Sequence, residues 1–151
     1  MPPAADTPLA IGIDIGTSGA RAVAMRPDFS IAARSAVPLE SFGQNARDPA
    51  VWWSAVGAAL AELLSRIDRT AVRSIAVDGT SGTLLPIDGA GRPLAGPLMY
   101  NDTVADNAIL AAIAREAPAT SAALGATSGL AKALWFQRTP GVAAVLHQAD
   151  W

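Results

Sequence analysis

The amino-terminal part of the chain alternates between short apolar segments and turn-forming residues. Leu9 to Ile15 is apolar and β-branched, and a Gly/Thr/Ser turn leads directly into a second apolar run, Ala20 to Met25. A third run, Ser30 to Val37, follows the turn signal Pro27-Asp28. The pattern predicts a β-hairpin extended by one more strand, which makes a three-stranded meander.

The next segment has the spacing of a helix with one apolar face. Asp48 offers a side-chain acceptor at the N-cap, and Pro49 suits the first turn, where its missing N–H leaves no hydrogen bond unmade. We expect a helix that packs against a core along this face. The apolar residues that recur at helical spacing are Val51, Trp52, Ala55, Val56, Ala59, Leu60, Leu63, Leu64 and Ile67.

The remaining segments mix strands and helices. Short strands are predicted at Val72–Val77, which has the composition of a buried strand, and at Leu84–Ile87, from which a turn at 88–91 leads into Pro93–Leu98. Helices are predicted at Thr103–Glu116 and Leu130–Arg138. A meander, a helix and then mixed elements predict an α/β domain.

The two ends of the chain give separate expectations. Residues 1–8 are expected to form a disordered tail, which leaves residues 9–151 as one domain. Val142 to Trp151 begins another apolar segment with no capping signal behind it. We therefore expect the chain to stop inside an element, as an incomplete domain of a longer protein.

Composition narrows the classes of function. A sequence that is 51% hydrophobic and 16% charged suits a domain with a substantial core. The net charge of −2, with no basic stripe, argues against binding to nucleic acid or to an anionic membrane. The absence of cysteine fits a reducing cytoplasm, and the start lacks the basic and apolar regions of a signal peptide. We expect a soluble cytoplasmic protein, whose oligomeric state the sequence leaves open.

The turn from Asp14 to Gly19 combines a carboxylate with glycines and hydroxyls. Glycines allow positive φ angles and close approach of the backbone, so that N–H groups can converge on a phosphate, and Thr17 and Ser18 add hydroxyl donors. Asp14 would hold Mg²⁺ through water and so reach the phosphates. No lysine follows the glycines and a strand comes next, so the segment is neither a Walker nor a Rossmann motif. An ordinary hairpin is the alternative interpretation.

Several motifs together resemble one family. The run Ile11-Gly-Ile-Asp-Ile-Gly-Thr-Ser-Gly-Ala-Arg-Ala-Val-Ala-Met25 is similar to the first phosphate motif of the FGGY family of carbohydrate kinases. Asp48-Pro49 with Trp52-Trp53 resembles the start of that family's first helix, and the run 74–85 resembles its next core strand and sugar-contacting loop. The resemblance implies an actin/hexokinase-like (ribonuclease H-like) ATPase domain, with a mixed sheet whose amino-terminal meander is flanked by helices.

Within the family, the resemblance points to a kinase of ketopentoses. Asp78-Gly-Thr-Ser81, Tyr100-Asn101 and the run 147–151 look most like D-ribulose kinases of cyanobacteria and chloroplasts. A xylulokinase or another polyol kinase is the alternative within the family. A non-enzymatic actin-like nucleotide-binding or regulatory protein and a plain α/β interaction module are the alternatives from other classes.

The resemblance also implies roles for individual residues. Substrates and cofactors would be a small-molecule sugar, ATP and Mg²⁺, with the metal held by Asp14 through water. The phosphate-binding candidates are Asp14, Gly16, Thr17 and Ser18. The sugar-binding candidates are Asp14, Asp78, Ser81, Gly82, Tyr100 and Asn101.

Some of these residues have a structural alternative. Asp78 is also interpreted as a residue that stabilises its own turn, and Asn101 is interpreted equally well as the cap of the helix near Thr103. By the same resemblance, Thr127 and Ser128 fall in a loop near the family's substrate cleft, and Lys132, on the helix behind that loop, is interpreted equally well as a solvated charge. His147 is interpreted as a structural hydrogen-bonding residue rather than a base. No catalytic residue is assigned, because the family's base and adenosine-binding motifs would lie beyond Trp151, in a carboxy-terminal domain.

Overall fold

A computed structural model describes residues 7–151, and the chain divides into two compact units, Met1–Gly79 and Thr80–Trp151. The expected tail at 1–8 falls mainly on residues 1–6, which lie outside the described residues, while Thr7 and Pro8 have no regular structure. No helix within residues 7–151 has the length and apolar character needed to cross a membrane.

The first unit is a mixed four-stranded sheet with one long helix. The sheet has the order β3-β2-β1-β4; β1, β2 and β3 form an antiparallel meander, and β4 lies parallel to β1. The meander and the helix agree with the sequence prediction to within a few residues. The elements are β1 (Leu9–Ile15), β2 (Gly19–Met25), β3 (Ile31–Pro38), the 3-10 helix η1 (Leu39–Ser41), α1 (Pro49–Leu64), η2 (Arg69–Ala71) and β4 (Val72–Gly79).

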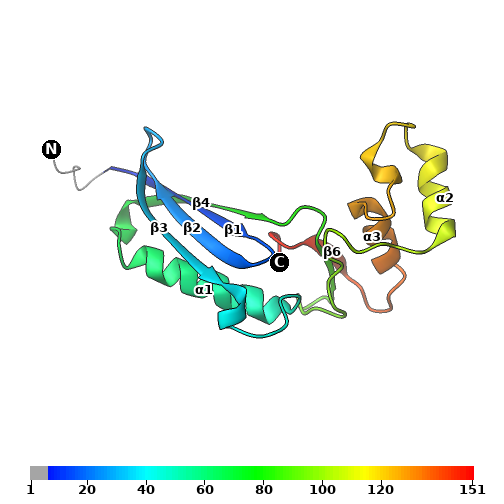
Figure 1. The fold of residues 1–151 in the computed structure, drawn as a ribbon, viewed down its shortest axis with the longest axis horizontal. Coiled ribbons are helices and arrows are strands. Elements are labelled where there is room, and N and C mark those ends of the chain that lie inside the picture. Colours follow the sequence, from blue (N-terminus) through cyan, green and yellow to red (C-terminus); the bar gives the residue numbers. More distant parts are fainter. Residues whose placement is uncertain (1–6) are drawn as a thin grey trace. The chain divides into compact units, whose positions relative to one another are not determined.

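The core of this unit lies between α1 and the strands β2 and β3, beside which α1 runs (Figure 1). Strand β2 presents three alanines to this core, each at most 3% exposed, and such small side chains let the helix approach closely. Asp48 caps α1 as predicted, because its carboxylate accepts a hydrogen bond from the N–H of Ala50 at 2.9 Å. The buried residues include Leu9, Ile11, Ile13 and Ile15 of β1, Ala20, Ala22 and Ala24 of β2, and Val51, Trp52, Ala55, Ala59 and Leu63 of α1.

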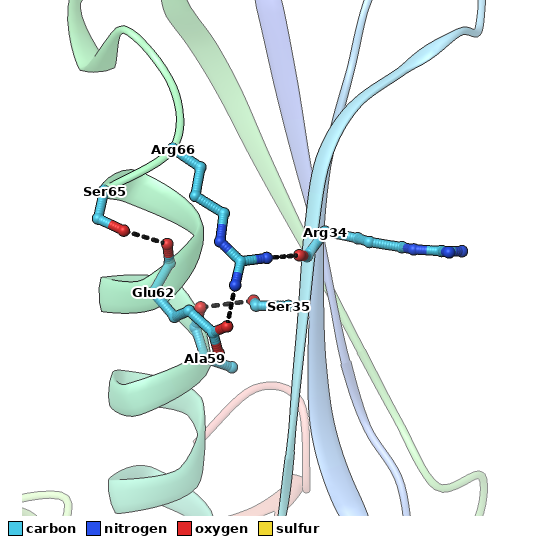
Figure 2. Close-up of polar contacts among 6 residues, drawn as sticks. All are labelled: Arg34, Ser35, Ala59, Glu62, Ser65 and Arg66. Atoms are coloured by element: carbon cyan, nitrogen blue, oxygen red, sulfur yellow. Dashed lines mark hydrogen bonds and ion pairs between the residues drawn. The ribbon is translucent and has the colours of Figure 1, made fainter.

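Polar contacts fix α1 against β3, as Figure 2 shows. The buried hydroxyl of Ser35 donates to the carbonyl oxygen of Ala59 at 2.6 Å. Arg66 donates to the carbonyl oxygen of Arg34 at 2.8 Å and pairs with Glu62, one turn earlier in the helix. Because Ser35 is held in a buried site, its hydrogen bond also satisfies a hydroxyl that would be costly to leave unpaired.

Strand β4 differs from its prediction as a buried strand. Ile75 and Val77 are 55% and 46% exposed. The register aligns them with Ile11 and Ile13 of β1, so they face the same side as α1. Because α1 lies mainly over β2 and β3, no described residue buries these two side chains.

The second unit joins a small sheet to two helices. Its elements are β5 (Leu84–Ile87), α2 (Asn107–Glu116), η3 (Ala122–Leu124), α3 (Gly129–Phe136) and β6 (Ala144–His147), and β5 pairs with β6 in antiparallel fashion. The apolar cluster between the helices is formed by Val104, Ile109, Ile113 and Ala131, with Leu98, Leu110 and Leu134 packed against it.

The predicted start of α2 is corrected. Helix α2 begins at Asn107 rather than near Thr103, because Asp106 caps it by accepting hydrogen bonds from the N–H groups of Ala108 and Ile109. Asn101 is therefore not the cap. In the last predicted apolar segment, Val142 to Trp151, the strand β6 ends at His147 and the residues after it form a turn.

Candidate functional site

The Asp14 turn connects β1 to β2 in the first unit. The N–H of Gly16 donates to the carbonyl oxygen of Gly19 at 3.0 Å and closes the turn, while Thr17 and Ser18 are exposed at its tip. The only positive φ angles of glycines within residues 7–151 are at Gly82, Gly91 and Gly141, so the expectation of positive φ in this turn is wrong. Close packing explains Gly19 instead, since a Cβ there would lie 2.6 Å from the carbonyl oxygen of Val37.

The carboxylate of Asp14 lies in a row of charges at one end of the sheet. Arg21 is its cross-strand neighbour on β2 and donates to Asp14 Oδ2 at 2.8 Å. On its other side Asp14 is in register with Asp78 of β4, which places both acidic side chains on the same face. The ion pair is about half exposed, so it orients the carboxylate more than it stabilises the fold.

Arg21 was not singled out in the sequence, although its position carried a signal. It is the single charged residue in the apolar strand β2 and follows the turn by two positions. A hollow of about 230 Å³ beside the turn is lined by Ser18 and Arg21, together with small and apolar residues. A larger groove of about 670 Å³ has Asp14 and Arg21 in its wall. A hydroxyl, a guanidinium and a carboxylate therefore face accessible space at this end of the sheet.

The donor set at Asp14 suits a hydrated magnesium ion. Mg²⁺ keeps several waters and commonly takes only one or two carboxylate ligands from a protein. Asp14 provides one such carboxylate at a half-exposed position, and Asp78 is its neighbour on the sheet. No group of three or more acidic or histidine residues that could form an all-protein cage occurs within residues 7–151.

A second set of candidates meets in the second unit. The N–H of Thr83 donates to the carbonyl oxygen of Thr80 at 3.1 Å, which makes a turn with Gly82 in the left-handed region at φ 73°. A side chain is strained at this φ, so glycine is required there. Ser81 and Gly82 of this turn line a cavity of about 400 Å³ together with Tyr100.

The same cavity is lined by the loop before α3. Thr127 and Ser128, which the sequence placed near the substrate, belong to its wall, whereas Asn101 does not. The hydroxyl of Ser128 is used in folding: it accepts from the N–H of Ala131 at 3.1 Å and donates to the carbonyl oxygen of Ala123 at 2.9 Å. Ser81, Tyr100 and Thr127 are exposed and carry the hydroxyl groups that remain suited to a polyol.

The turn at Thr80 is held by residues that follow β6. Gln148 is 2% exposed, and its side-chain oxygen accepts from the N–H of Thr80 at 2.9 Å. Its main-chain N–H donates to the carbonyl oxygen of Thr83 at 3.0 Å. His147 donates from Nε2 to the carbonyl oxygen of Thr80 at 3.2 Å, while its Nδ1 accepts from Ala149. These bonds support the structural interpretation of His147. Gln148 was missed, because a glutamine at the end of an apolar run gives no sign of burial.

Lys132 is the clearest departure from expectation. Its side chain is fully buried rather than solvated, and its ammonium group donates to three main-chain carbonyl oxygens, those of Met99 at 2.6 Å, Gly82 at 2.9 Å and Tyr100 at 3.2 Å. Burial lowers the pKa of Lys132, and the negative charge of Asp102 opposes that shift.

Most of the chain matches known proteins. A family model, the N-terminal domain of the FGGY family of carbohydrate kinases, matches residues 9–129. The xylulose kinase of Streptomyces coelicolor is 29% identical over 142 residues, which cover 92% of this chain and 26% of that protein. The xylulose kinase of Staphylococcus xylosus is 27% identical over 99 residues, which cover 62% of this chain and 20% of that protein.

Solved structures share the fold. A xyloylose kinase from Brucella ovis has a TM-score of 0.74 at 21% identity, and the match covers 94% of this chain and 33% of that one. The xylulose kinase of Rhodospirillum rubrum has a TM-score of 0.69 at 24% identity, with 94% and 32% covered. These likenesses confirm the predicted actin/hexokinase-like α/β class, and the chain spans about a third or less of each relative's length. Since the family model covers most of the sequence, the protein belongs to the FGGY family of carbohydrate kinases.

Proposed function

We propose that this chain is the amino-terminal part of an ATP-dependent kinase that transfers the γ-phosphate of ATP to a hydroxyl of a ketopentose. The observation that carries the proposal is the pair of sites built by the family's motifs. One unit presents Asp14 and the hydroxyls of its turn at the end of a sheet, and the other lines a cavity with hydroxyl-bearing residues. Phosphoryl transfer needs positioned phosphates, a metal ion and an oriented alcohol. The Asp14 turn suits the phosphates and the metal ion, and the cavity suits the alcohol.

On the phosphate side, Asp14 would hold Mg²⁺ through water. The ion would neutralise charge that develops on the phosphates. The turn residues Gly16, Thr17 and Ser18 would bind the γ-phosphate through N–H and hydroxyl donors. Arg21 keeps the Asp14 carboxylate oriented at 2.8 Å and adds a positive charge beside Ser18.

On the sugar side, hydroxyl groups would be read by Ser81, Gly82 and Tyr100, whose loops line one cavity. Asn101 is proposed as a further contact because it follows Tyr100 and is exposed. Asp78 would stabilise the end of β4 and the start of the sugar loop, because its carboxylate accepts a hydrogen bond from the N–H of Gly79 at 2.8 Å. We propose that the base and the adenosine site lie in a carboxy-terminal domain beyond residue 151.

For the substrate we propose a ketopentose, with D-xylulose ahead of D-ribulose. The relatives that match this chain at 27% and 29% identity are named xylulose kinases. The motif at Asp78 to Ser81 with Tyr100-Asn101 favours D-ribulose as the second candidate. The absence of cysteine supports a cytoplasmic site of action.

The test is a turnover assay of the longer protein that contains this chain, with Mg-ATP and a panel of pentuloses and pentitols. We expect ADP release that depends on one pentulose, and no turnover from the 151-residue chain alone. Asp14→Asn should lower kcat on the order of 100-fold, because it removes charge that acts on the metal and phosphates. Asp28→Asn is the matched control, since Asp28 lies in an exposed turn and the amide can keep its bond from Ser30.

Two outcomes would contradict the proposal. A folded longer protein that binds ATP but phosphorylates no sugar in the panel would favour a non-enzymatic nucleotide-binding protein. Robust phosphorylation of a pentulose by the 151-residue chain would show that the base is not beyond it.

A further inference from the structure

Lys132 is a buried charge in helix α3, and it is the only lysine in the chain. An ammonium group removed from water destabilises a fold unless its donors and charge are matched. A leucine or methionine would fill such a site at lower cost. The presence of a lysine therefore calls for an explanation in what its ammonium group contacts.

The ammonium group is saturated by main-chain acceptors. It has three N–H donors, and they meet the carbonyl oxygens of Gly82, Met99 and Tyr100 at 2.9, 2.6 and 3.2 Å. Asp102 supplies the compensating charge, and its carboxylate also accepts from the N–H of Met99 at 2.7 Å. Since no donor is left over, Lys132 is not arranged to bind a ligand directly.

The three carbonyl oxygens belong to two of the loops that line the cavity proposed for the sugar. Gly82 lies in the turn that carries Ser81, and Tyr100 lies on the segment after Leu98, yet both line the same cavity. The two loops are adjacent at this point: a Cβ on Gly82 would be in ordinary van der Waals contact, at 3.9 Å, with both Lys132 Nζ and the Cα of Tyr100. The ammonium group of Lys132 therefore connects both loops to α3.

We propose that Lys132 is a positioning residue for the sugar, and that it acts by tying the Gly82 and Tyr100 loops to α3 without touching the substrate. The inference rests on the proposed function, because it deepens the role of the cavity that Ser81 and Tyr100 line. Loss of the ammonium group would let the loops separate and weaken the grip on the sugar. The phosphate turn belongs to the other unit, so ATP binding would be unchanged.

The test compares Lys132→Met with the wild type in the longer kinase proposed above. Methionine keeps an unbranched apolar stem and removes all three donors. We expect the KM for the pentulose to rise at least about tenfold, because small displacements of positioning groups are costly, with the KM for ATP unchanged. Lys132→Arg keeps the charge but presents a planar fork to three converging carbonyls, so it should restore the sugar KM only in part.

The matched control is Arg115→Met, which removes an exposed positive charge from the last turn of α2. It should change neither KM. An unchanged sugar KM in Lys132→Met would overturn this inference alone. Equal losses for sugar and ATP with a lowered melting temperature would also overturn it, since they indicate general destabilisation. Absence of turnover by the wild type with every pentulose would overturn the proposed function, and this inference with it.

If Lys132→Met does not fold, a measurement on the wild type tests the positioning role of Lys132. With ¹⁵N-lysine labelling of the longer kinase, the side-chain Nζ signal that is absent from the spectrum of Lys132→Arg belongs to Lys132. Saturating pentulose should shift it while ATP should not. A signal that does not respond to the sugar that the kinase turns over would overturn the inference.

Discussion

The turn between β1 and β2 depends on the absence of a side chain at Gly19. A Cβ at this position would lie 2.6 Å from the carbonyl oxygen of Val37, whereas ordinary contacts begin at 3.4 Å. That oxygen is main-chain, and the register of β2 with β3 holds it in place. Gly19→Ala must therefore displace one strand, and overpacking of this kind lowers the free energy of unfolding by about 1 to 3 kcal/mol.

Gly57→Ala makes the same chemical change at a position where it should have the opposite effect. Gly57 is exposed in the interior of α1, and a Cβ there meets nothing within 4 Å. Alanine is the better helix former, so this variant should raise the free energy of unfolding by about 0.5 to 1 kcal/mol. Urea unfolding followed by far-ultraviolet circular dichroism measures the free energy of unfolding of both variants. Amide hydrogen exchange of β2 measures the stability of the first unit separately. A Gly19→Ala protein as stable as the wild type, with the same urea dependence, would refute the close approach of β2 to β3.

Three further predictions concern stability. Leu63→Ala empties a fully buried position in α1 and should lower the free energy of unfolding by about 2 to 5 kcal/mol in the same urea assay; no loss would contradict the assigned core. Asp48→Ala removes the N-cap of α1 and should lower the free energy of unfolding by about 1 kcal/mol, whereas Asp48→Asn should retain most of the stability that the cap provides. The N–H of Ile109 and the guanidinium of Arg138 hold the pKa of Asp106 below its ordinary value of 3.8. The contribution of the Asp106 carboxylate to the free energy of unfolding should be fully present above that value and should be lost as pH falls through the lowered pKa of the folded state. In Asp106→Asn, the free energy of unfolding should therefore depend less on pH in this range.

Local signals explain why the first unit could be predicted. The apolar runs of β1 to β3 are interrupted by turn residues, and Asp48-Pro49 marks the start of α1, so each element is encoded within its own segment. The candidates Ser81, Gly82 and Tyr100 were also found, through motifs, and the structure brings them to one cavity.

Other features depend on contacts between distant segments and could not be predicted. Burial of Lys132 requires three carbonyl groups from two loops to converge on α3, and nothing in its own helix indicates them. Exposure of Ile75 depends on where α1 packs rather than on the sequence of β4. The pairing of Asp14 with Arg21 and its alignment with Asp78 follow from strand register, which a single sequence specifies only indirectly.

The proposed kinase activity is tested most directly by identifying the phosphorylated product. The longer protein that contains this chain is incubated with Mg-ATP and D-xylulose, and in parallel with D-ribulose, and the reaction is followed by ³¹P nuclear magnetic resonance. We expect a new sugar phosphate monoester signal that grows in step with ADP and needs both sugar and Mg²⁺. Release of inorganic phosphate alone, or ATP left intact with every pentulose, would contradict it.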